Sequence, residues 1–177
     1  RYKAFIKNPN CQQQKKLLEV LPTEKVEAID EEILEYLFTN LSYLEELAYR
    51  GNSNAINSLF RMIYLTDGAS TSWIQITLGK TIYNYPQEFL YALEDNFQVV
   101  TKSGLGSLVG NLGAEYVDNA EKSVAELERR YTAIKNVRNV PQEMRNLCLY
   151  QLSRQIFEYR KDIIYLNDNQ KLLKKVN

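Results

Sequence analysis

The fold is decided by the stretch from Leu47 to Asp95, which reads LAYRGNSNAINSLFRMIYLTDGASTSWIQITLGKTIYNYPQEFLYALED. Its apolar residues recur three or four positions apart, as they do on the buried face of an α-helix. This periodicity predicts three short amphipathic helices, over about residues 54–65, 71–83 and 86–97, joined by compact turns. We expect the rest of the chain to pack on either side of them.

Residues at the ends of these predicted helices support the assignment. Gly51 suits the end of a preceding helix, since glycine adopts a left-handed backbone at the least cost. Pro86 suits a first helical turn, where its missing N–H would have no partner. The candidate capping residues are Asn52 or Ser53 for the first helix and Ser70 or Ser72 for the second.

A family resemblance rests on the small and apolar residues Leu47, Ala48, Gly51, Asn52, Ala55, Ile56, Leu59, Asp67, Leu78, Gly79, Pro86, Phe89, Leu90, Ala92 and Leu93. Their spacing resembles that of HEAT-type helical repeats over residues 47–95. The resemblance implies antiparallel helix pairs that stack into a curved rod. The chain departs from the family pattern at Trp73, Ile74 and Gln75, which stand where a Val-Arg pair would be expected.

The whole chain is predicted to be all-α. Helical spacing extends through most of its 177 residues, and no segment shows the alternation of a β-strand. We expect stacked antiparallel helix pairs, either a HEAT-like α-α superhelix or an irregular helical bundle, with about eight or nine helices in one domain. The predicted parts are an arm over residues 1–10, N-terminal helices over 11–50, central helices over 51–97, C-terminal helices over 105–166 and a fraying tail over 167–177.

A glycine-rich segment follows the central helices, with four glycines between Gly104 and Gly113. Glycines at the start of a helix can cradle phosphate, but this spacing matches no phosphate-binding motif and no strand precedes it. Leu105, Leu108 and Val109 lie at helical spacing instead. We therefore expect the glycines to let this helix approach a neighbouring helix closely.

The pattern N-x-P-Q-E occurs twice, at residues 84–88 and 139–143. It is either the trace of an internal repeat or a coincidence of two helix starts, since proline followed by Gln-Glu suits a first helical turn. Both interpretations predict that a helix begins at each position.

The chain carries no net charge, with 22 basic and 22 acidic residues, which argues against nucleic acid as a partner. The charges are unevenly distributed. Residues 24–46 hold eight acidic residues and one basic residue, whereas residues 122–175 hold twelve basic and six acidic residues. These segments are either solvated helix faces or two electrostatically distinct ends, one of which meets a charged partner.

Several chemistries are disfavoured by what the chain lacks. It has no histidine, the usual acid–base group near neutral pH and the commonest zinc ligand, and its two cysteines alone cannot hold a structural zinc ion. The adjacent carboxylates Glu45 and Glu46 would point about 100° apart on a helix. No apolar run approaches the roughly 20 residues of a membrane span. We therefore expect no enzyme activity, no catalytic residues, no metal, no cofactor and no membrane span.

Cys11 and Cys148 are a candidate disulfide pair. Cys148 shares a helical stripe with Met144 and Leu152, where a buried free thiol is ordinary. Cys11 lies among polar residues, where burial alone does not explain it, and the two thiols could pair in an oxidising compartment.

The chain begins at Arg1, so we expect either a trimmed fragment or the mature part of an exported protein. The favoured location is periplasmic or secreted, with a cytoplasmic location as the alternative.

Aromatic side chains provide the candidate binding site. Tyrosine occurs thirteen times, and it favours interfaces because it buries a large area at low entropic cost while keeping a polar tip. Trp73, Tyr83 and Tyr85 either complete the core between helical layers or form a binding surface with Asp67 at its edge.

These observations favour a non-enzymatic protein–protein interaction module. One subclass that we consider is an inhibitor or immunity-type protein of an exported system. The alternative is a helical domain that binds a small apolar ligand between its layers. The expected partner is another protein and not a nucleic acid, and the sequence leaves the oligomeric state open.

Overall fold

The computed structural model describes residues 2–7, 10–24, 31–66, 68–100 and 102–176, and these ranges contain helices but no strand. The predicted all-α class is therefore confirmed. The elements are α1 (Tyr2–Lys7), α2 (Cys11–Leu18), α3 (Glu31–Thr39), α4 (Leu41–Ala48), α5 (Ser53–Met62), the 3-10 helix η1 (Ile63–Leu65), α6 (Gly68–Asn84), α7 (Pro86–Asp95), α8 (Lys102–Gly110), the 3-10 helix η2 (Ala114–Tyr116), α9 (Ala120–Asn136) and α10 (Gln142–Val176).

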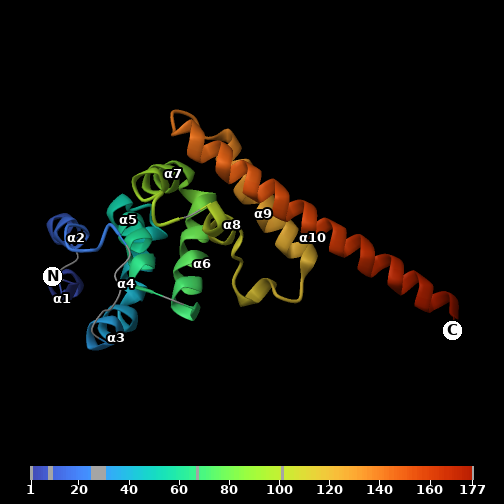
Figure 1. Cartoon of the computed structure of the whole chain (residues 1–177), viewed down its shortest axis with the longest axis horizontal. Helices are drawn as coiled ribbons and strands as arrows, with labels where there is room; N and C mark the ends of the chain where they lie inside the picture. The colour runs from blue at the N-terminus through green and yellow to red at the C-terminus, as the bar shows by residue number, and fades with distance from the viewer. Residues whose placement is uncertain (1, 8–9, 25–30, 67, 101, 177) are drawn as a thin grey trace.

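Helix α6 lies at the centre of the molecule. It contacts α4, α5 and α7, which belong to the same half of the chain, and also α8 and α9 from the other half. Its apolar residues Ile74, Leu78 and Ile82 are fully buried. In Figure 1 the two chain termini lie at opposite ends of the array, with α6 between them. The rest of the chain thus packs on both sides of the central stretch, as predicted.

The local predictions for α5 are confirmed. Ile56, Leu59 and Phe60 have no exposed surface, so the apolar stripe faces the core. Asn52 caps the helix, because its side chain accepts a hydrogen bond from the Ala55 N–H at 3.0 Å. Gly51, which precedes the cap, has φ of +78°, the left-handed backbone that glycine adopts most easily.

Helix α6 begins earlier than predicted. It starts at Gly68, so Ser70 and Ser72 lie within the helix and do not cap it. The Ser72 hydroxyl instead accepts a hydrogen bond at 3.0 Å from the side-chain amide of Asn111, the residue that follows α8. The predicted cap assignment was wrong because a serine near a helix start can also bond to a distant partner, which the local sequence does not reveal.

The prediction of an arm over residues 1–10 was also wrong for residues 2–7. Residues Tyr2–Lys7 form α1, and Phe5 has no exposed surface and belongs to the hydrophobic core. Burying one phenylalanine stabilises by about 2–3 kcal/mol, which helps to hold so short a helix on the body of the protein. Within the predicted N-terminal helices, α3 is described from Glu31 to Thr39, and a break at Asn40 separates it from α4.

Helix α10 is longer than predicted. Its backbone is helical from Gln142 to Val176, so the predicted tail over 167–177 continues the helix as far as it is described. No glycine or proline occurs after Pro141 to end it. Helix α9 pairs with its first half in antiparallel fashion, since Arg145 bonds to the Ile134 carbonyl and Arg160 to Glu128. The second half of α10 extends beyond the other helices (Figure 1).

The glycine-rich segment forms α8, and close packing against a neighbour is confirmed. A Cβ atom added at Gly106 would lie 3.1 Å from Oε1 of Gln151 on α10. Gln155 of α10 also donates to the Gly106 carbonyl, and a side chain at Gly110 would collide with Gln155. The two N-x-P-Q-E patterns begin α7 and α10, as both interpretations predicted.

The structure does not support the disulfide. Cys148 is a free cysteine with no exposed surface, on the core face of α10. The side chain of Cys11 is not described, but α2 and α10 lie in opposite parts of the array (Figure 1). Burial raises the pKa of the Cys148 thiol from 9.0 to about 12, because the core disfavours the thiolate.

We predict that Cys148 is unreactive in the folded protein. In a Cys11→Ser variant, a thiol reagent at pH 8 should modify Cys148 only at the rate of unfolding, because the thiol is buried and protonated. Above pH 9 the unfolded chain loses this proton first, so stability should fall as the pH rises from about 9 towards 12. Rapid modification in native buffer, at the rate of a model thiol, would contradict the buried placement.

Candidate functional site

Each residue of the predicted aromatic surface that the structure describes has a partner of its own. Trp73 is 53% exposed, and its indole N–H donates to Glu45 of α4 at 2.6 Å. Tyr83 lies under the guanidinium of Arg129, with 3.9 Å between its ring centre and the arginine carbon. Tyr85 packs beside Gly51, where a Cβ would collide with its ring. The three aromatic rings therefore have three different partners. Asp67 lies outside the described residues.

The carboxylates Glu45 and Glu46 have separate roles. Glu45 accepts hydrogen bonds from Trp73 and from the buried hydroxyl of Thr77, and so joins α4 to α6. Glu46 pairs with Arg50 one turn along, at 2.6 Å on the exposed side of the helix. Among the described residues, no group of three or more His, Cys, Asp or Glu side chains is placed to hold a metal ion.

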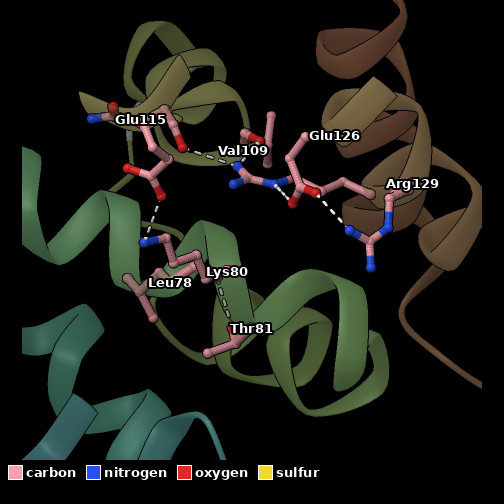
Figure 2. A network of polar contacts seen from close by, with 9 residues as sticks. Leu78, Lys80, Thr81, Val109, Glu115, Glu126 and Arg129 are labelled. Atoms are coloured by element: carbon pink, nitrogen blue, oxygen red, sulfur yellow. Dashed lines mark hydrogen bonds and ion pairs between the residues drawn. The ribbon is translucent and has the colours of Figure 1, made fainter. Parts of the chain in front are cut away.

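A second candidate is the buried arginine of α9. Arg130 is only 1% exposed, and its Nη1 donates to the carbonyls of Val109 at 2.9 Å and Asn111 at 3.0 Å. Its Nε donates to Glu126 at 3.3 Å, and the other oxygen of Glu126 accepts from Arg129. Figure 2 shows Glu126 between Arg129 and the end of α8 at Val109.

This charge is compensated within the protein. Burial lowers the pKa of Arg130, and the charge and hydrogen bond of Glu126 oppose that shift, so the guanidinium stays protonated. Gly79 of α6 makes room for it, since a Cβ there would lie 2.5 Å from Nη1. The hydrogen bonds of Arg130 named above all go to carbonyls or to a carboxylate of the same chain. The side chain therefore links α8 and α9 and packs against α6, and it offers little to a ligand.

An exposed pair lies at the edge of this network. Lys80 of α6 and Glu115 of η2 approach to 3.0 Å (Figure 2). A hydrogen bond from its own backbone N–H, together with one from Lys80, lowers the pKa of Glu115. Burial lowers the pKa of Lys80, but the hydrogen bond and charge of Glu115 raise it by more. Both side chains are about half exposed, so the pair contributes little stability.

The third candidate is the outer face of α10. Met144, Cys148, Leu152 and Ile156 form the core face of this helix and are buried. On the opposite side, Tyr150 is 60%, Phe157 64% and Ile164 63% exposed. We call these three residues the outer row. They recur every seven residues, which brings a helix back to nearly the same face after two turns.

A groove borders the outer row. Tyr131 of α9 and Ile156 and Phe157 of α10 line a pocket of about 300 Å³ with Glu128, Ser153 and Arg160. It lies at the surface between α9 and α10 and is open to solvent. Other pockets, of about 360 Å³ between α8 and α10 and about 500 Å³ at the α9–α10 turn, are lined mainly by polar and charged side chains.

The outer row could have been found in the sequence, because its seven-residue spacing is visible there. The spacing of Met144, Cys148 and Leu152 indicates only the stripe that packs against the core. The groove beside Phe157 could not be found in this way, since it depends on how α9 lies against α10. The same is true of Arg130, whose partners are 19 and 21 residues away.

Paired substitutions separate the two neighbouring arginines. Arg130→Met should lower the free energy of unfolding by about 3 kcal/mol or more, because it leaves the carbonyls of Val109 and Asn111 without this donor and removes one of the two cations that pair with Glu126. Arg129→Met, which removes an exposed side chain, should lower it far less. Urea unfolding of both variants measures the difference. Equal losses would show that Arg130 has no special role in the packing.

Comparisons of the chain with protein-family models, with curated proteins and with solved structures find no match. Within the described ranges, no helix combines the length and the apolar character that crossing a membrane requires. The functional assignment therefore depends on the geometry of the surface itself.

Proposed function

We propose that this protein is a non-enzymatic binding module that holds another protein on the outer face of α10. The observation that carries the proposal is the exposure of the outer row. Two aromatic side chains and an isoleucine project into solvent from α10, whose other face is packed against the core as far as Ile156. Exposed single apolar residues are common, but a row of them on one helix face is typical of an interaction site.

The energetics favour an interface at this row. Transfer of one large apolar side chain from water to a buried environment stabilises by about 1.5–3 kcal/mol. Aromatic residues are also enriched among those that contribute most to protein interfaces. Tyr150 and Ile164 are 14 positions apart, or about 21 Å along the helix, which is the length of four turns of a partner helix.

The outer row supports protein binding better than the other candidate functions. Its side chains point outward from α10, so they give no support to a small apolar ligand held between helical layers. Residues 47–95 resemble HEAT-type repeats, and stacked helix pairs of that type often present extended binding surfaces. The inhibitor or immunity-type role and the location outside the cytoplasm stay predictions, as does the HEAT-type arrangement itself.

Affinity capture with matched variants tests the proposal. The full chain, immobilised and exposed to an extract of the organism that makes it, should retain one protein in stoichiometric amount. The double variant Phe157→Ser/Ile164→Ser should lose that protein, because the apolar anchors are gone. Val117→Ser should keep it, since Val117 is 78% exposed but lies between η2 and α9, away from the row.

Circular dichroism and urea unfolding serve as the folding control for each variant. Equal recovery on the wild-type chain and on the double variant would contradict the proposed face. Recovery of no stoichiometric protein on the wild-type chain would contradict the proposed function.

A further inference from the structure

We infer that the outer row receives an acidic amphipathic helix of a partner protein, which lies along α10. The inference rests on the proposed function above and adds the chemistry of the partner. Its basis is the charge on either side of the row, together with the groove beside Phe157.

On α10 the charged side chains nearest to Phe157 are basic, and Glu128 of α9 lines the groove beside it. Successive residues on a helix are rotated by about 100°, so Arg154, Arg160 and Lys161 lie within about 60° of Phe157 on the helix surface. The acidic residues Glu158 and Asp162 lie about 100° and 140° away, on the side that lines the pocket facing α8. A partner on the outer row therefore meets Arg154 and Lys161 on one flank, and on the other flank Arg160, which is paired with Glu128 of α9.

These cations are available for a partner's carboxylates. Arg160 pairs with Glu128, and Lys161 pairs with Glu158 at 3.9 Å, but all four side chains are 43–69% exposed. Pairs between exposed side chains contribute little, so they exchange readily for a contact that also buries apolar surface. Arg154 is exposed as well.

A second copy of this chain fits the row poorly. In an antiparallel pair centred on Phe157, Tyr150 would face Ile164 of the other copy, which is favourable. However, Arg154 would lie close to the other copy's Lys161, because in a two-fold antiparallel pair both lie on the same flank, three and four residues from the centre. Like charges placed opposite each other in an interface are costly, so the row disfavours self-association and favours an acidic partner.

Nucleic acid is also a poorer occupant. The chain has no net charge, and the row itself contains one aliphatic residue, which offers no surface for base stacking. The regular spacing of two helical turns matches another helix. The groove of about 300 Å³ beside Phe157 has room for one apolar side chain of that helix.

The geometry points to a partner pattern. A helix that places an apolar residue opposite Phe157 should carry carboxylates four positions before and four positions after it, since those positions lie on the flanks of Arg154 and Arg160 when the two helices face each other. The pattern is acidic-x-x-x-apolar-x-x-x-acidic, and it reads the same in both directions. Parallel and antiparallel partners therefore satisfy it equally.

Two labelled helical peptides with identical apolar residues test this inference on the full chain. One carries glutamate at the flanking positions and the other carries lysine. Fluorescence anisotropy at low salt should show binding of the glutamate peptide, with the lysine peptide at least about ten-fold weaker. Arg154→Glu/Arg160→Glu should reverse this order, and Phe157→Ser/Ile164→Ser should abolish binding of both.

The control variant is Lys15→Glu/Lys16→Glu, which changes the net charge equally on exposed residues of α2. It should leave the preference unchanged. Equal affinity for both peptides, no binding of the glutamate peptide up to about 1 mM, or a preference unaffected by the charge reversal at Arg154 and Arg160 would overturn the inference.

Further probes distinguish the competing occupants. Tighter binding of a single-stranded 20-nucleotide DNA than of the glutamate peptide would overturn the inference in favour of nucleic acid. Sedimentation that shows a dimer dependent on Phe157 would overturn it in favour of self-association. If the captured protein requires the row but presents a basic segment, the inference fails while the proposed function stands. If no protein requires the row, both fail.

Discussion

The structure depends on one buried contact, the guanidinium of Arg130 above Gly79. The glycine leaves a space on α6, and the arginine fills it while donating to carbonyls at the end of α8. This contact holds α9 against the central helix, and α9 in turn pairs with the first half of α10. The core face of α10 is then directed inward, and the outer row is directed into solvent.

The parts of the fold that could be predicted from the sequence are those that local spacing determines. The buried stripe of α5, the cap by Asn52 and the left-handed Gly51 depend on neighbours within four residues. The parts that could not be predicted depend on distant contacts. The residues around Phe5 give no local sign that it is buried, and its helix is held by packing against the rest of the chain.

The candidate site shows the same division. Trp73 and Tyr83 were identified because aromatic residues favour interfaces, but Glu45 and Arg129 engage them, and these partners lie 28 and 46 residues away. The sequence shows these aromatic residues but not the partners that engage them. The outer row of α10 differs, because its seven-residue spacing can be read directly from the sequence. Its exposure to solvent could not be read there, since it depends on how α8 and α9 pack on the other side of the helix.

The free energy of unfolding of a Gly79→Ala variant tests the central contact most directly. Alanine is favoured over glycine within a helix by about 1 kcal/mol, so helix propensity alone predicts a more stable protein. The contact predicts the reverse, because the added Cβ would lie 2.5 Å from the Arg130 guanidinium and 3.3 Å from the Asn111 carbonyl. Gly106→Ala, where the Cβ meets only the ends of the Gln151 and Gln155 side chains, is the reference. A Gly79→Ala protein less stable than wild type and than Gly106→Ala would support the account, and one more stable than both would contradict it.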